Sequence, residues 1–313
     1  MTLRAPRPAP MLRLALLLAL LGTGLAAEAQ ERTVALTFDD LPVAGAMTDG
    51  EARAVTDAIL VALAAADATA SGFVNTRGLD DAGRDLLDRW VGAGHRLENH
   101  SHSHPHFNGA ETAPYLADVA LGHDRLQAFL GDRQRVGWYR APFNETGETE
   151  EKRDALLALL ADQGVRLAPF TAETADWMFN AVYVRALEAA DYDRAARVVL
   201  AYAEYLDAVM ADAERLSTDT FGREIPQILL LHANRLTADT MRYVLRGLLR
   251  RGYAVVPLDE AVADPAYDTP NAYEGRWGIS WLHRWRVGLG LPNALRDAPE
   301  PPAWITEALE EAE

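Results

Sequence analysis

Val34-Ala-Leu-Thr-Phe-Asp-Asp40 joins an apolar run to two adjacent carboxylates, Asp39 and Asp40. A short run of this kind is typical of a buried strand, so residues 33–38 are predicted to form the first strand of the fold. The two carboxylates then follow its carboxyl end. Barrels of parallel strands build their active sites at that edge. The stretch therefore predicts a buried strand and, at its end, a functional site.

Downstream of this strand, β-rich runs alternate with amphipathic helical segments, the first of which follows a helix cap at Thr48 or Asp49. The predicted strands are residues 33–38, 71–75, 96–99, 136–139, 165–168, 225–231 and 253–256. The predicted helices are residues 51–66, 80 to about 93, 112–130, 149–162, 180–220 and 237–251. Repeated βα units of this kind predict an α/β fold around a parallel sheet or barrel. The helical stretch 180–220 exceeds what a barrel unit needs, so we expect an insertion packed beside the site.

Asn99-His-Ser-His-Ser-His-Pro-His106 contains four of the chain's eight histidines. Two pairs, His100/His104 and His102/His106, have the spacing that lets imidazoles converge on one ion. Two imidazoles and one carboxylate leave open positions on a divalent ion, where a water can lose a proton near neutral pH. A second carboxylate can accept that proton. Taken alone, the Asp pair would also suit a turn, and the His-Ser repeat a solvated metal-binding loop.

The first 29 residues are typical of a secretory signal peptide. Three arginines precede an apolar run at residues 14–25, and Ala27-Glu-Ala29 offers a small-residue cleavage site. We therefore expect a periplasmic or secreted protein, the alternative being an uncleaved anchor. No later apolar stretch approaches the ~20 residues needed to cross a bilayer, so no stable membrane insertion is expected after cleavage.

The composition excludes several classes of function. The chain of 313 residues has no cysteine, which excludes a disulfide framework, a lipid-anchored cysteine and thiolate catalysis. Its net charge of −16 disfavours nucleic acid and other strongly anionic partners.

Five motifs give the chain a specific resemblance. In order along the chain they are Thr37-Phe-Asp-Asp40, Asn99-His-Ser-His-Ser-His-Pro105, Arg140-Ala-Pro-Phe143, Asp176-Trp177 and Leu230-Leu-His232. Their order and approximate spacing resemble those of polysaccharide deacetylases, the NodB-like carbohydrate esterase family four. The resemblance implies a deformed (β/α) barrel of the NodB type at residues 30–264, with the helical insertion at about 180–220. It also implies a divalent metal ion, for which we expect zinc.

Carried over residue by residue, the resemblance implies that Asp40, His100 and His104 hold the metal ion. Asp39 would be the general base, and His232 would be the general acid that protonates the leaving group. The family pairs histidines four apart with Ser or Thr after the first, so His102 and His106 fall outside the matching pair.

The resemblance implies supporting roles for five further residues. Arg140 would orient Asp39 and keep it ionised, as a guanidinium beside a carboxylate does. Asp176 would orient or tune His232. Trp177 would wall the pocket, Leu230 would line a slot for the acetyl methyl group, and the backbone N–H of Phe143 would stabilise the oxyanion. Two departures from the family pattern concern loop geometry: Leu41 replaces a common Gly, and Phe143-Asn144 replaces Tyr-Gly.

The segment 265–313 is an aromatic-rich C-terminal extension. Trp277, Trp281 and Trp285 recur at every fourth position, with Tyr267 and Tyr273 nearby. Exposed rings would stack on sugars, whereas buried rings would dock the segment on the barrel. A stripe at helical spacing is more often packing, so we expect docking.

The sequence thus predicts a metal-dependent hydrolase that removes N-acetyl groups from an acetylated polysaccharide or oligosaccharide. One alternative is an O-acetyl esterase acting on xylan-like polymers, because the same site can cleave either bond. Another is a catalytically inactive homologue that binds glycan or stores metal. An iron oxygenase would use the same ligand types, but the parallel-barrel order and the second aspartate disfavour it.

Overall fold

The computed structural model describes residues 32–310, so the predicted signal peptide at residues 1–29 lies outside the described part. The strands are β1 Arg32–Leu41, β2 Ala70–Val74, β3 Arg96–Asn99, β4 Trp138–Tyr139, β5 Arg166–Leu167, β6 Ala172–Glu173, β7 Gln227–His232 and β8 Tyr253–Val255. The helices are α1 Asp49–Ala65, α2 Asp81–Gly92, α3 Thr112–Leu130, α4 Glu150–Gln163, α5 Asp176–Glu188, α6 Tyr192–Phe221, α7 Arg235–Arg250, α8 Leu258–Ala261, α9 Trp281–Gly288 and α10 Ala303–Glu310. Short 3₁₀ turns are η1 Thr76–Gly78, η2 Gly131–Arg133, η3 Pro142–Asn144, η4 Pro265–Asp268 and η5 Leu295–Asp297. None of the helices in this part of the chain has the length and apolarity of a membrane span.

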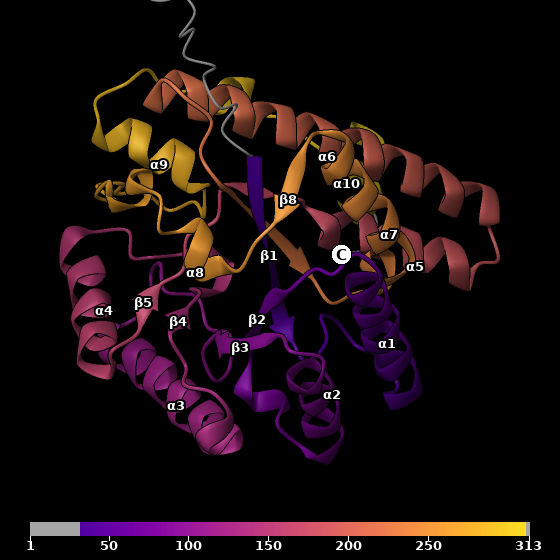
Figure 1. Ribbon diagram of the computed structural model, residues 1–313, viewed down its shortest axis with the longest axis horizontal. Helices are drawn as coiled ribbons and strands as arrows, with labels where there is room; N and C mark the ends of the chain where they lie inside the picture. Colours follow the sequence, from indigo (N-terminus) through magenta and orange to yellow (C-terminus); the bar gives the residue numbers. More distant parts are fainter. Residues whose placement is uncertain (1–31, 311–313) are drawn as a thin grey trace, which may run out of the picture. The chain divides into compact units, whose positions relative to one another are not determined.

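All pairings in the sheet are parallel, and β1 lies at its centre (Figure 1). The strand order is β5-β4-β3-β2-β1-β7-β6, and β8 also pairs with β1. Val34 of β1 pairs with both Gln227 of β7 and Val255 of β8. Because the two partners must lie on opposite sides of β1, β8 occupies the side that β2 takes further along the strand. Helices α1 to α4 follow one another around the outside of the strands (Figure 1).

The sheet curls until its two edge strands approach each other. β5 ends at Leu167 and β6 begins at Ala172, so the connection between them holds no helix. Within it, the N–H of Ala168 donates to the Tyr139 carbonyl at 2.7 Å, and the N–H of Thr171 donates to the Ile228 carbonyl at 3.0 Å. The connection therefore bridges β4 and β7, and the strand ends face a common centre.

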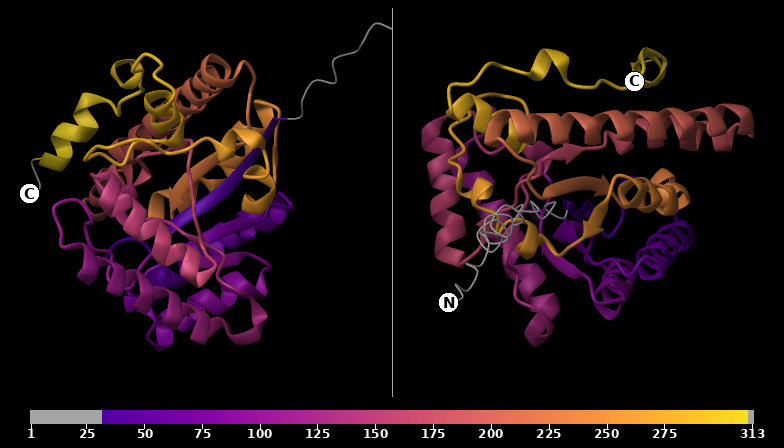
Figure 2. Two further views of the ribbon diagram at one scale, coloured as in Figure 1. Left: turned by 90° about the vertical axis from the view of Figure 1, so that its left-hand side faces the viewer. Right: turned by 45° about the horizontal axis from the view of Figure 1, so that its top comes forward.

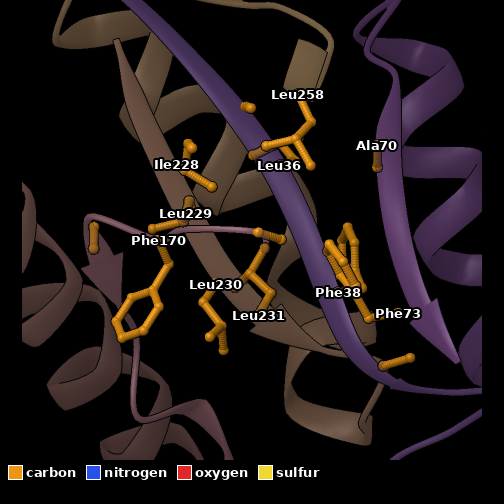
Figure 3. Close-up of a cluster of buried hydrophobic side chains, with 14 of the residues drawn as sticks. Leu36, Phe38, Ala70, Phe73, Phe170, Ile228, Leu229, Leu230, Leu231 and Leu258 are labelled. Atoms are coloured by element: carbon orange, nitrogen blue, oxygen red, sulfur yellow. The ribbon is translucent and has the colours of Figure 1, made fainter. Parts of the chain in front are cut away.

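The core lies on both faces of β1. Residues 34–38 of β1 are at most 1% exposed, because strands of a parallel sheet are covered on both sides. Figure 3 shows part of this core, in which Leu36 and Phe38 lie between Phe73 of β2 and the leucines of β7. The β1 strand is thus held rigidly where it leaves the core, and its final residues belong to the site described below.

The predicted helix cap and the predicted long helical stretch are both present. Thr48 caps α1 in a capping box with Glu51, whose side chain accepts from the Thr48 N–H at 2.9 Å. The stretch 180–220 is divided at residues 189–191 into two helices, α5 and α6, which pack against each other.

The C-terminal segment, residues 265–310 in the described part of the chain, packs on helices α5 and α6. Helix α9 contacts α6 and helix α10 contacts α5, and Figure 2 shows this yellow segment along the same side as α6. Trp281 and Trp285 are 6% and 1% exposed, in agreement with docking, whereas Trp277 is 75% exposed. Two rings of the stripe therefore hold the segment in place, and the third faces solvent.

Candidate active site

The carboxylates of Asp39 and Asp40 lie within β1 and not after it. The strand continues to Leu41, with an irregular register between Phe38 and Leu41. Asp40 has a φ of 62°, in the left-handed region that non-glycine residues rarely adopt. Such an irregularity turns side chains away from their regular alternation. Both neighbouring carboxylates can therefore face the same edge of the sheet.

Asp40, His100 and His104 form the one group of three potential metal ligands found among residues 32–310. The Asp40 Oδ1 atom is 3.4 Å from the Nε2 atom of His100 and 3.4 Å from that of His104. Ligand atoms about 2.1 Å from a tetrahedral zinc ion lie about 3.4 Å from one another. The observed spacing and the donor types therefore fit one tetrahedral cation.

The hydrogen bonds of His100 leave the correct nitrogen free for a metal. Its Nδ1 atom is 2.8 Å from the Arg140 carbonyl, which can only accept, so the proton sits on Nδ1. The Nε2 lone pair then faces Asp40. Burial lowers the pKa of His100, but the carboxylates of Asp39 and Asp40 together raise it by more than burial lowers it. The net shift of the pKa is therefore upward. A cation at the Nε2 atom would therefore compete with a proton for it.

Asp40 and His104 are in the protonation states that a metal requires. Burial lowers the pKa of His104 to about 4, helped by the charge of His100, so its imidazole is neutral at pH 7. Burial raises the pKa of Asp40, but the hydrogen bond and charge of His100 outweigh it and hold the pKa well below its usual range. An anionic carboxylate and a neutral imidazole are the forms that ligate.

Arg140 provides the charge partner of Asp39. The Arg140 Nη1 atom lies 3.4 Å from Asp39 Oδ2, and the two side chains are 0% and 4% exposed. Its Nη2 atom donates to the Pro169 carbonyl at 3.0 Å and to Thr37 Oγ1 at 3.3 Å. The guanidinium also lies over the Phe73 ring at 4.7 Å. A cation fixed on several sides in this way pairs with the Asp39 side chain and restricts its position.

His232 and Asp176 form a second buried pair beside Asp40. Asp176 accepts from the His232 backbone N–H at 2.7 Å, from His232 Nδ1 at 2.6 Å and from Thr237 Oγ1 at 2.9 Å. Burial lowers the pKa of His232, but the charge and hydrogen bond of Asp176 raise it to about 10. The His232 Nε2 atom is 4.0 Å from Asp40 Oδ2. A proton on this nitrogen therefore faces the Asp40 carboxylate.

The three residues predicted to contact substrate occupy different environments. Phe143 lies in η3 with a φ of 53° and is 44% exposed. Trp177 is the second residue of α5, after Asp176, and is 53% exposed. Leu230 of β7 is buried and pairs in register with Thr37 of β1. Phe143 thus offers an accessible ring beside His104, and Trp177 an accessible ring next to Asp176, whereas Leu230 can only line an inner wall.

The other histidine pair of the tract does not join the cluster. His102 Nδ1 pairs with Thr76 Oγ1 at 3.0 Å, and His106 Nδ1 pairs with Glu145 Oε1 at 3.1 Å. The His106 ring stacks on Phe143 at 3.6 Å between centroids. The structure therefore shows that His100 and His104 lie with Asp40, whereas His102 and His106 do not. The equal spacing of the two pairs in the sequence could not decide between them.

The structure also adds two polar residues to the site. Asn75 follows β2 directly, and its Nδ2 atom donates to Asp40 Oδ1 at 2.7 Å, which fixes that carboxylate. Glu173 ends β6, and burial raises its pKa although the charge of His232 opposes this. Asn75 stands at the carboxyl end of a predicted strand, the one sequence signal that could have indicated it. No strand was predicted at β6, so Glu173 had no such signal.

Gly122 of α3 makes room for the histidine tract. A Cβ atom there would lie 2.5 Å from the Ser101 carbonyl carbon and 2.8 Å from the His102 nitrogen. We expect Gly122→Ala to destabilise the protein by about 1–3 kcal/mol, because the tract must shift, and to weaken zinc binding. The control is Gly247→Ala in α7, where a Cβ meets open space and alanine should stabilise by about 0.5–1 kcal/mol. Urea unfolding and zinc titration of both variants measure this; similar effects in the two would contradict it.

Comparisons with known proteins give a consistent result. Residues 26–172 match the family model for polysaccharide deacetylase. The structure is similar to that of a CE4 esterase from Streptococcus mutans, with 20% identity and a TM-score of 0.52, over 73% of this chain and 86% of that chain. No curated protein matches the chain.

Two further solved structures are similar at a lower score. One is the peptidoglycan deacetylase PdaC from Bacillus subtilis, with 21% identity and a TM-score of 0.49, over 76% of this chain and 95% of that chain. The other is a CE4 family pseudoenzyme from Bacillus anthracis, with 17% identity and a TM-score of 0.49, over 74% and 66% of the two chains.

The match to the Streptococcus mutans esterase confirms the fold class expected from the sequence, a deformed (β/α) barrel. The family match covers β1, the histidine tract and the Arg140 motif, the segments that bring Asp39, Asp40 and His100 together. Residues 26–172 therefore match a polysaccharide deacetylase domain, the family that the five motifs of the sequence resemble.

Proposed function

We propose that this protein is an exported, metal-dependent deacetylase that hydrolyses N-acetyl groups of a glycan. The observation that carries the proposal is the placement of two buried charge pairs beside one potential metal site. Asp39 with Arg140 and His232 with Asp176 both lie against Asp40 and its histidines. Export, to the periplasm or the medium, rests on the sequence of residues 1–29 alone.

A divalent ion held by Asp40, His100 and His104 would polarise the acetyl carbonyl and lower the pKa of water. Zinc suits this donor set of two imidazoles and one carboxylate. Asp39 would accept the proton of the attacking water, because the buried Arg140 guanidinium holds its side chain in position. The backbone N–H of Phe143 would donate to the developing oxyanion.

His232 would supply the proton for the leaving group. Its Nδ1 atom is held by Asp176 at 2.6 Å, so the Nε2 nitrogen is the one directed at the substrate side. The charge and hydrogen bond of Asp176 raise the pKa of His232, which favours a proton on that nitrogen. An amine departs poorly unless it is protonated, so this group favours amide hydrolysis over ester hydrolysis. That preference is why we propose N-acetyl and not O-acetyl groups.

Acetate release from defined polymers tests the proposal. Residues 30–313, loaded with zinc, are incubated with chitooligosaccharide, peptidoglycan and acetyl-xylan. We expect acetate from an N-acetylated substrate. Release from acetyl-xylan alone would favour the O-acetyl esterase, and release from none would favour an inactive, glycan-binding homologue.

We expect His232→Ala to harm amide hydrolysis more than ester hydrolysis. General acid catalysis contributes about 10²- to 10⁴-fold, so kcat on an N-acetylated oligosaccharide should fall in that range. With 4-nitrophenyl acetate the fall should be much smaller, because the nitrophenolate departs without protonation. Equal losses of kcat on the two substrates would reject the acid role.

A further inference from the structure

The C-terminal segment touches the active-site loop that carries Phe143. We call residues 141–146 the Phe143 loop. A Cβ atom on Gly278 would lie 2.1 Å from the Phe143 carbonyl oxygen, so only a glycine allows this approach. The Arg276 carbonyl also accepts from Asn108 Nδ2 at 2.7 Å. The segment thus lies directly against the loop, although it falls outside the matched family region of residues 26–172.

Arg284 of α9 makes the strongest of these contacts. It is 1% exposed, and its guanidinium donates to Thr146 Oγ1 at 2.6 Å and to the Asn144 carbonyl at 2.6 Å. A third bond goes to the Ile279 carbonyl at 2.8 Å, and the Trp281 ring lies 4.4 Å below the charge. All of these hydrogen-bond acceptors are neutral oxygens, and none of them is a carboxylate. Burial lowers the pKa of Arg284 to about 10, and it stays charged at neutral pH.

The Phe143 loop needs such a contact because its backbone is strained. Phe143 and Asn144 have φ values of 53° and 57°, so two consecutive non-glycine residues are left-handed. Residues in this region carry a free-energy cost and persist only where the surroundings hold them. Arg284 binds the carbonyl of the second of these residues. The guanidinium is therefore placed to maintain the conformation that directs the Phe143 N–H.

The Phe143 loop also contacts the histidine tract and the residues that follow it. Glu145 accepts from the N–H groups of Phe107 at 2.7 Å and Asn108 at 2.9 Å, and it pairs with His106. The Phe143 ring meets the edge of the His104 ring at 4.5 Å between centroids. A displaced loop would therefore disturb both the oxyanion contact and the wall of the metal site.

We propose that Arg284, supplied by the C-terminal segment, is a positioning residue for deacetylation that clamps the Phe143 loop in its active conformation. The proposal rests on the proposed function of the site and extends it to a part of the chain outside the matched family region. The C-terminal segment then contributes to the active site in addition to packing on the barrel.

Arg286 offers a matched control on the same helix. It is 8% exposed and donates to Thr220 Oγ1 at 3.1 Å and to the Pro292 carbonyl at 3.1 Å, without a contact to the Phe143 loop. Arg284→Met and Arg286→Met each remove one buried guanidinium at nearly constant volume. Arg284→Lys keeps the charge but loses the forked donors. All three are made in residues 30–313 with zinc bound.

The measurements are kcat and KM on an N-acetylated oligosaccharide, the zinc content, the Tm and amide hydrogen exchange of residues 141–146. We expect Arg284→Met to lower kcat by about 10- to 100-fold, because oxyanion contacts are sensitive to small displacements, with full zinc content. Its loop amides should exchange faster than in Arg286→Met. Arg286→Met should keep kcat at a comparable loss of Tm, and Arg284→Lys should recover part of the activity.

Two results would overturn the clamp. The first is the same kcat in Arg284→Met and Arg286→Met, and the second is unchanged exchange of the loop amides in Arg284→Met. If the unsubstituted protein releases no acetate from any substrate, the proposed function fails separately. The hydrogen exchange comparison then still decides whether Arg284 holds the loop.

Discussion

Asp39→Asn should abolish turnover while the protein keeps its zinc. The amide cannot accept a proton from the attacking water, and general base catalysis contributes about 10²- to 10⁴-fold. The substitution leaves the three proposed ligands in place, because Asp40, His100 and His104 keep their own contacts. The measurements are kcat on an N-acetylated oligosaccharide and zinc per protein chain by elemental analysis.

Asp39→Asn also leaves the Arg140 guanidinium buried without its anion. Removing one partner of a buried ion pair typically costs about 3–5 kcal/mol, so the variant should unfold at a lower temperature. Activity is therefore measured well below the Tm of the variant. Full activity at equal zinc content would reject the base role of Asp39, whereas loss of zinc would show that Asp39 is a ligand.

His100→Ala and His104→Ala should each lose both zinc and activity. A site of three protein ligands that loses one imidazole has too few donors to retain the ion at micromolar zinc. His102→Ala is the matched control, because His102 lies in the same tract but pairs with Thr76. That variant should keep zinc. Retention of zinc by His100→Ala, or equal loss from His102→Ala, would contradict the assignment.

Much of the fold follows from local patterns in the sequence. The strand at 96–99 and the helix at 112–130 have the predicted bounds. β6 was not predicted, because its two residues Ala172 and Glu173 carry no periodic signal and owe their strand geometry to pairing with β7. The carboxylates of Asp39 and Asp40 were expected after the strand. They lie inside it, because pairing of Leu41 with Val74 extends β1 beyond its apolar run.

A site residue could be predicted from the sequence where it stands at the end of a predicted strand and also belongs to a motif. Asp40, His100 and His104 converge as the order of the motifs implied. The role of Arg284 could not be predicted in this way. Its partner Thr146 is 138 residues away in the sequence, and the aromatic stripe around Arg284 indicated only packing. Contacts of this kind depend on how the C-terminal segment folds back, which no local pattern records.

Anomalous diffraction at the zinc absorption edge, from crystals of residues 30–313 grown with zinc, locates the ion directly. One peak should lie about 2.0–2.2 Å from a carboxylate oxygen of Asp40 and from the Nε2 atoms of His100 and His104. A peak held instead by His102 and His106, or none near Asp40, would contradict the metal site on which the proposed deacetylase activity depends.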